Sequence, residues 1–219
     1  LLDHPHPDGA NPATGPVYVR GAEPGDALIV DIKKIDLAPE GFLAVKAGDG
    51  LLGHLAAEFA TRMVPIKDGV VHFNDLCFPA HPMVGVIGTA PAGDGISTSF
   101  AGPHGGNMDN KYLAAGSRIY LPVATDGALW SLGDVHGAMG DGEITFIGLE
   151  ICAEVTVKVA IEKGTAPNRP LIETPTHWIT TGDHLDLGQA ARIAATEMVE
   201  LMQIRGGLSF NDAYMLMSA

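Results

Sequence analysis

Glycine and proline recur along the whole chain and divide its apolar sequence into short segments. The 219 residues include 28 glycines and 15 prolines. The segments between them alternate apolar and polar residues or are nearly continuously apolar, which is typical of short strands joined by tight turns. We expect strands at 16–21, 26–37, 70–74, 83–89, 118–124, 127–133, 143–151 and 153–163. The chain is therefore predicted to fold around a mainly β core.

Helical patterns are fewer and gather near the end of the chain. From Leu187 apolar residues recur at helical spacing as far as Gly206 and Gly207, and a second helix is expected from Ser209, with Asp212 completing a variant of the capping box. Residues 51–61 form a weaker helical candidate. We expect residues 1–184 to form a β-rich catalytic core and residues 185–219 a helical segment packed on it, as one structural unit with a small α+β portion.

Charge and cysteine content indicate which binding partners are not expected and in which cell compartment the chain is expected. The chain has 26 acidic against 13 basic residues. This balance repels phosphate backbones and anionic lipid surfaces, so neither nucleic acid nor a membrane is an expected partner. Two cysteines, Cys77 and Cys152, are too few for a disulfide framework. These features predict a soluble protein of the reducing cytoplasm.

Four ionisable residues cluster among glycines in the stretch "SLGDVHGAMGDGEITF", residues 131–146. Asp134 and His136 are two positions apart, as are Asp141 and Glu143, so each pair shares a face wherever the backbone is extended. Carboxylates with an imidazole can bind Zn²⁺ or a similar divalent ion, and a further carboxylate can act as a general base. A turn rich in Asp and Gly is the alternative, and spacing alone favours it.

A second motif, "GPHGGNMDNKYL" at residues 102–113, combines paired glycines with Asn107 and Asp109. Glycines allow close backbone approach, and backbone N–H groups could stabilise an oxyanion while Asp109 binds or orients a ligand. An Asx-type turn explains the same residues equally well. The motif lacks the Lys-Ser/Thr of a phosphate-binding loop.

Taken together and in order, several motifs resemble the acetamidase/formamidase family of amidohydrolases. They are "NPATGPVYVRGAEPGDALIVDI", "GVIGTAPA", "GGNMDN", "AGSRIYLPVATDGALWSLGDVHGAMGDGEI" and "LEICAEVTVKV". The likeness runs from about Asn11 to Met217. It implies a mostly β fold with sandwich-like and barrel-like parts, and hydrolysis of formamide or acetamide to the carboxylic acid and ammonia. Family members usually extend beyond both ends of this stretch, so we expect the chain to be truncated at both ends.

The resemblance also implies roles for individual residues. It implies a divalent metal, Zn²⁺ before Ca²⁺, bound by Asp109, Asp134 and His136. Glu143 or Asp141 would then serve as the acid–base group. Asn107 and the backbone at Gly105 and Gly106 would stabilise the oxyanion. A homodimer or higher homo-oligomer is expected.

Two other functions remain open at this point. An acidic β domain whose Asp/Gly loops bind Ca²⁺ for stability, without catalysis, would carry the same loops. A hydrolase of another small C–N compound, such as a urea-like or carbamoyl molecule, is the second possibility. The sequence does not separate these substrates from formamide or acetamide, because one methyl group changes the discrimination between substrates only modestly.

Overall fold

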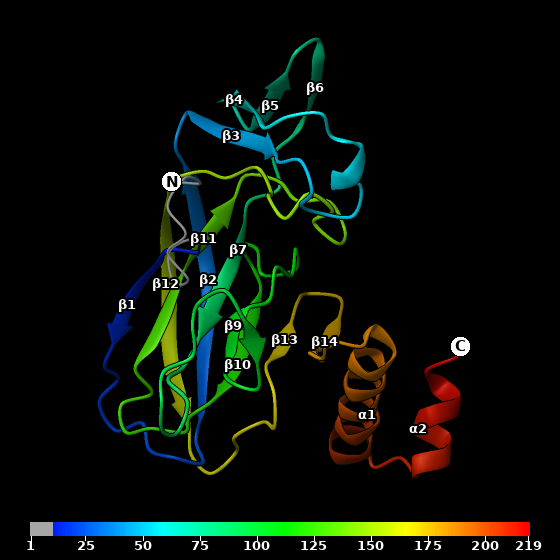
Figure 1. Ribbon diagram of the computed structural model, residues 1–219. Helices are drawn as coiled ribbons and strands as arrows, with labels where there is room; N and C mark the ends of the chain where they lie inside the picture. The colour runs from blue at the N-terminus through cyan, green and yellow to red at the C-terminus, as the bar shows by residue number, and fades with distance from the viewer. Residues whose placement is uncertain (1–10) are drawn as a thin grey trace.

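Antiparallel strand pairs make up most of the regular secondary structure in this computed structural model, which describes residues 11–219 (Figure 1). These residues form two five-stranded sheets and one four-stranded sheet. The first sheet has the strand order β1-β11-β7-β9-β8, with the bounds Ala13–Val17, Trp130–His136, Met83–Gly88, Gly105–Asn107 and Ala101–Gly102. The second has the order β12-β2-β10-β13-β14, with the bounds Ala153–Glu162, Ala27–Leu37, Arg118–Pro122, Leu171–Glu173 and Trp178–Thr180.

The main core lies where these two sheets bring their apolar side chains together. Leu28 and Ile32 of β2 and Ile119 of β10 are fully buried, and they belong to one cluster with Val84 and Ile87 of β7. Apolar side chains that face each other from two sheets are the usual core of a sandwich. The mainly β, sandwich-like class predicted from the sequence is therefore confirmed.

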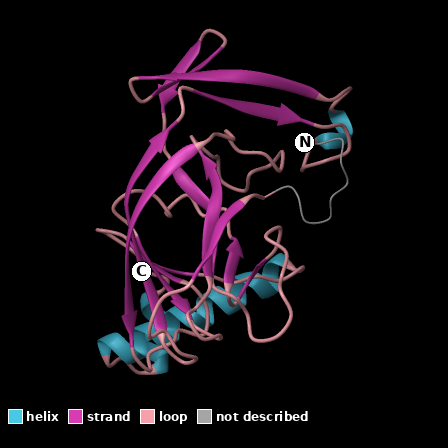
Figure 2. Cartoon of the chain, turned by 90° about the vertical axis from the view of Figure 1, so that its left-hand side faces the viewer, coloured by secondary structure: helices cyan, strands magenta, loops and turns pink. Residues whose placement is uncertain are grey.

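The third sheet has a small core of its own. Its order is β3-β4-β5-β6, with the bounds Glu40–Val45, Ala60–Lys67, Val70–Phe73 and Leu76–Pro79. Val64, Ile66 and Val71 pack there against Leu149, which lies much later in the chain, between β11 and β12. Figure 2 shows this sheet at one end of the molecule, away from the helices that end the chain. Leu149 thus joins the third sheet to the segment that follows β11.

Two helices end the described chain. α1 runs from Leu187 to Gly206, with Asp186 as its N-cap and Gly207 in the left-handed conformation at its C-cap. α2 runs from Phe210 to Leu216, and the Ser209 side chain caps it by accepting from the Asp212 amide. α1 lies beside β14, where Thr180 Oγ1 donates to the Ala194 carbonyl. Within residues 11–219, no helix is both long and apolar enough to cross a membrane.

Four local expectations are wrong, and the first is the strand expected at 16–21, which lies at Ala13–Val17 instead. Residues 51–61 contain only a short 3-10 turn, Gly53–Leu55, because the chain turns back and Ala60 pairs with Val45 of β3. The strand expected at 127–133 begins instead at Trp130 and continues to His136, since Gly127, Ala128 and Leu129 adopt left-handed turn conformations. The strand expected at 143–151 is reduced to bridges at Glu150. Left-handed φ angles at Glu143 and Phe146 prevent an extended run there.

Candidate active site

His136 is the buried centre of a cluster of partly buried acidic groups at the end of β11. Its side chain is 1% exposed. The Nε2 atom lies 3.3 Å from Asp109 Oδ1, 3.8 Å from Asp134 Oδ2 and 3.8 Å from Glu143 Oε1. On the other side of the ring, Nδ1 lies 3.2 Å from Glu150 Oε1. Four carboxylates therefore surround one imidazole.

Strand pairing brings the first two carboxylates together. β11 pairs with β7, which places Asp134 opposite Gly85, and the Gly85 carbonyl accepts from the amides of Met108 and Asp109. A Cβ at Gly85 would lie 2.6 Å from Asp109 Oδ1 and 2.9 Å from Asp134 Oδ2. The absent side chain at Gly85 is what leaves room for both carboxylates.

The other two carboxylates come from the loop between β11 and β12. The Glu150 backbone exchanges hydrogen bonds with Phe42 of β3 and also forms a bridge with His136. Gly148 lies against the His136 ring, and a Cβ there would be 2.1 Å from Nδ1. The third sheet and this glycine thus hold the loop against the imidazole.

Three of these acidic residues have unusual backbone conformations. The φ angles of Asp109, Asp134 and Glu143 are 41°, 53° and 40°. Left-handed conformations are uncommon for residues other than glycine, and such strain persists only where surrounding structure imposes it, often at functional sites. The fold therefore holds these side chains in place at a local energetic cost.

Burial and crowding shift two pKa values in the cluster. Burial disfavours the charged imidazole, but the adjacent carboxylates of Asp109, Asp134 and Glu150 outweigh it and raise the pKa of His136 to about 12. Burial, reinforced by the charge of Asp109, raises the pKa of Glu143 to about 7. The cluster carries excess negative charge that one proton on His136 only partly compensates.

The donor atoms suit a divalent cation. Two groups of three could each hold an ion, namely Asp109, His136 and Glu143, and Asp134, His136 and Glu150. Asp109 Oδ1 and both ring nitrogens of His136 are buried without a hydrogen bond of good geometry among the described residues. Buried polar atoms normally have partners, and a bound ion is one explanation for those that lack them.

Of the six residues singled out from the sequence, four meet in this cluster: Asp109, Asp134, His136 and Glu143. Asn107 adjoins it, because Asn11 Nδ2 donates both to Asn107 Oδ1 at 3.1 Å and to Asp134 Oδ2 at 2.9 Å. Asp141 does not join it. Its side chain is 80% exposed and pairs with Lys111.

The two glycines expected to stabilise an oxyanion can also be located. Gly105 and Gly106 lie inside β9, between β7 and β8, so their backbone faces neighbouring strands rather than an open cavity. Sequence reasoning missed Glu150, which was assigned to an ordinary strand, and Asn11. No local spacing links either residue to the cluster; a bridge to His136 brings Glu150 there, and a hydrogen bond to Asp134 brings Asn11.

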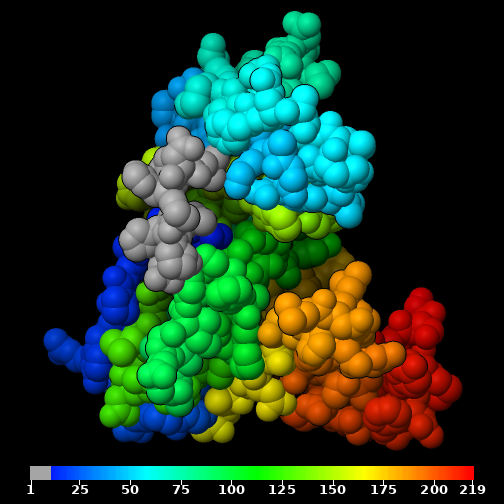
Figure 3. Space-filling model, viewed as in Figure 1, coloured from blue at the N-terminus to red at the C-terminus, as the bar shows by residue number. Residues whose placement is uncertain are grey.

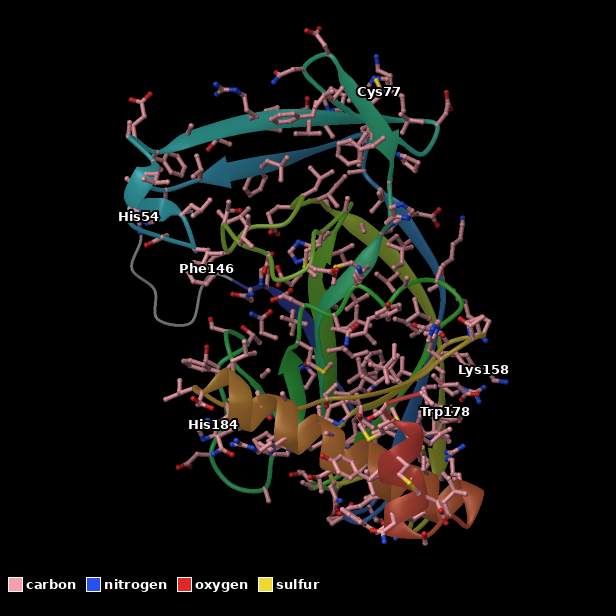
Figure 4. The ribbon with its side chains drawn as sticks, turned by 90° about the vertical axis from the view of Figure 1, so that its right-hand side faces the viewer. His54, Cys77, Phe146, Lys158, Trp178 and His184 are labelled. Atoms are coloured by element: carbon pink, nitrogen blue, oxygen red, sulfur yellow. The ribbon has the colours of Figure 1, made fainter. Side chains whose placement is uncertain are left out.

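A cavity of about 250 Å³ reaches the cluster at Asp109. Its wall combines polar residues with the apolar side chains of Met108, Met139 and Ile179. Lys111 and Asp141 also line it. In Figure 3 the blue segment near residue 50 lies directly above the yellow-green loop after β11, and Figure 4 shows Phe146 of that loop on the same side of the molecule as His54.

Comparisons with known proteins agree with the resemblance. A model of the acetamidase/formamidase family matches residues 8–101 and 92–219. The crystal structure of an acetamidase from Bacillus halodurans is 43% identical, with a TM-score of 0.93 over 96% of this chain and 72% of that one. That of a predicted acetamidase/formamidase from Thermoanaerobacter tengcongensis is 42% identical, with a TM-score of 0.91 over 94% and 69% of the two chains.

A relative with a named activity is the formamidase of Methylophilus methylotrophus, which is 30% identical over 209 residues. The match covers 68% of this chain and 51% of that protein. The chain thus spans about half the length of the curated relatives it matches first.

Proposed function

The chain belongs to the acetamidase/formamidase family, and from this membership we propose that it hydrolyses a short-chain aliphatic amide, formamide or acetamide, to the carboxylic acid and ammonia. The observation that carries the proposal is the cluster of four carboxylates around the buried imidazole of His136. Such a cluster is unfavourable for stability alone, because like charges are held together away from water.

We propose that Asp109, Asp134 and His136 bind a divalent cation, with Zn²⁺ favoured over Ca²⁺. The unpartnered Asp109 Oδ1 and His136 Nε2 support this assignment. A nitrogen ligand beside carboxylate oxygens is common at catalytic zinc sites, whereas Ca²⁺ prefers oxygen ligands alone. A cation bound there would polarise the amide carbonyl or lower the pKa of water.

Glu143 is the proposed general base. Its carboxylate lies 3.8 Å from His136 Nε2, and burial together with Asp109 raises its pKa to about 7. A carboxylate with a pKa near neutrality can accept a proton from water and return it to a leaving group. Water oxygen adds to the carbonyl carbon, Glu143 holds the proton, and cleavage of the C–N bond passes that proton to the departing nitrogen.

Asn107 is the proposed donor to the carbonyl oxygen. Its Oδ1 accepts from Asn11, so its Nδ2 points the other way and keeps donors for a substrate. In comparable sites the loss of one such donor costs about 3 kcal/mol of transition-state stabilisation.

The test is ammonia release from formamide and acetamide by the wild-type chain and by Glu143→Gln, with Glu154→Gln as the matched control. Glu154 lies on β12, exposed and outside the cluster. We expect Glu143→Gln to lose at least about 100-fold in kcat while keeping its fold, since general-base catalysis contributes that much. Equal turnover in Glu143→Gln would exclude this base. If Zn²⁺ raised the melting temperature of the wild-type chain but no ammonia were released, the result would instead support a non-catalytic, metal-stabilised domain.

A further inference from the structure

Glu143 lies on a loop with little regular structure, residues 137–149, which we call the Glu143 loop. Two hydrogen bonds close its base: the Gly137 amide donates to the Leu149 carbonyl, and the Leu149 amide to the Ala138 carbonyl. Between these ends the φ angle of Glu143 is 40°. A side chain on such a loop keeps a defined position only if the tip of the loop is also held.

The tip of the Glu143 loop is tied to the body at two points. The Leu51 amide donates to the Ile144 carbonyl at 2.8 Å, which joins the loop to the segment before β4. Lys111 Nζ lies 2.6 Å from Asp141 Oδ1, which joins it to the segment that follows β9. The second tie lies within two residues of a residue of the cluster at both of its ends.

The Lys111–Asp141 pair connects the two segments that carry Asp109 and Glu143. Lys111 follows Asp109 by two residues, and Asp141 precedes Glu143 by two. Both paired residues line the same cavity as Asp109. Any movement of the Glu143 loop away from Asp109 would therefore have to separate this ion pair.

The position of Asp141 argues against direct participation in the chemistry. Its side chain is 80% exposed, its carboxylate is engaged by Lys111, and it makes no ion pair with His136, unlike Glu143. Its geometry suits a tether instead.

We propose that Lys111 and Asp141 are positioning residues whose ion pair holds the Glu143 loop against the Asp109 segment. This inference rests on the proposed function, because it takes Glu143 to be the base. The net stability of an exposed ion pair is small, so the effect lies in geometry rather than in stability. Misplacement of a catalytic group by a fraction of an ångström is sufficient to slow turnover.

The experiment compares single neutral variants with the charge-reversed pair, and amide hydrolysis is the readout. Lys111→Gln and Asp141→Asn should each lower kcat about tenfold, with unchanged melting temperature and zinc content. The charge-reversed double variant Lys111→Asp/Asp141→Lys should recover most of this loss. The matched control is Asp36→Asn, which breaks an exposed pair with Lys34 on β2, 2.8 Å long, and should keep wild-type kcat.

A second readout does not depend on activity. Backbone hydrogen exchange across residues 139–148 should be faster in Asp141→Asn than in wild type, and unchanged in Asp36→Asn. The proposal would be overturned if the single variants kept the wild-type kcat. It would also be overturned if the kcat of the charge-reversed double variant were no higher than that of the single variants. Absence of ammonia release from the wild type would overturn the proposed function, while faster exchange in Asp141→Asn would still show the tether.

Discussion

The Nε2 atom of His136 lies 3.3 Å from Asp109 Oδ1, and neither atom has a hydrogen bond of good geometry within residues 11–219. Both atoms are buried. Strand pairing between β11 and β7 holds the His136 side chain in place, and a left-handed backbone conformation sets the position of Asp109. Two buried polar atoms left facing each other in this way are positioned to share a third partner. A cation between carboxylate and imidazole satisfies both.

The first prediction concerns metal affinity. Asp109→Asn and Asp134→Asn should each weaken Zn²⁺ binding by at least about tenfold, because each removes a charged ligand while keeping its shape. Equilibrium dialysis against Zn²⁺ measures the change directly. The wild type should also melt at a lower temperature after chelation. Asp36→Asn, with a half-exposed side chain outside the cluster, is the control, and full zinc occupancy in both cluster variants would refute the ligand assignment.

The second prediction concerns Glu150. Its Oε1 lies 3.2 Å from His136 Nδ1, so it favours the ring form whose Nδ1 carries the proton and whose Nε2 faces Asp109. Glu150→Ala should therefore lower Zn²⁺ affinity about 10- to 100-fold, as loss of such outer partners does. Glu150→Gln keeps an acceptor oxygen and should retain most of the affinity. Equal losses in the two variants would show that negative charge, not orientation, is what Glu150 supplies.

The third prediction links Glu143 to stability. Its folded pKa, about 7, lies above the ordinary 4.5, so the folded state binds the proton more tightly than the unfolded state. Stability from this group is therefore present below pH 4.5 and declines as the pH rises to 7. With a chelator present, the free energy of unfolding of Glu143→Gln should match that of wild type at pH 4 and exceed it by about 3 kcal/mol at pH 8.

Urea unfolding at both pH values measures this difference. Glu154→Gln, on the exposed part of β12, should show no comparable dependence on pH. A Glu143→Gln variant that is less stable than wild type at pH 8 would mean that the ionised carboxylate is stabilised in the fold.

The fourth prediction concerns a pair far from the cluster. Hydrogen bonds from Arg118 and Lys33 lower the pKa of Asp31 to about 2, and Arg118 Nε lies 2.5 Å from its carboxylate. Asp31→Asn should cost about 2 kcal/mol at pH 6, since hydrogen bonds between charged groups contribute that much. Because the folded pKa is depressed, this contribution is present above pH 3.8 and disappears as the pH falls toward 2. Urea titrations at pH 6 and 3 should show the gap narrowing, whereas Asp36→Asn should change little.

Local patterns in the sequence predict much of the fold. The strands at 27–37, 83–88 and 153–162, and both C-terminal helices with their caps, follow from apolar periodicity and capping residues that act within a few positions of one another. The segment 143–151 has the same apolar pattern, yet packing of Gly148 on His136 and the turn at Glu143 override it. Intrinsic strand preference is weak enough for such contacts to dominate.

The sequence alone predicts a mainly β chain, a resemblance to the acetamidase/formamidase family, and a set of acidic and imidazole groups suited to a metal-dependent hydrolase. Only the three-dimensional structure shows which of these groups lie close together. It gathers Asp109, Asp134, His136 and Glu143, adds Glu150 through a bridge to β11, and leaves Asp141 on the surface with Lys111. The physical reason is that side-chain periodicity sets only which face a residue shares with its neighbours. Proximity between positions such as 109 and 136 depends on the pairing of β7 with β11 and on a glycine at position 85 that leaves the space between them.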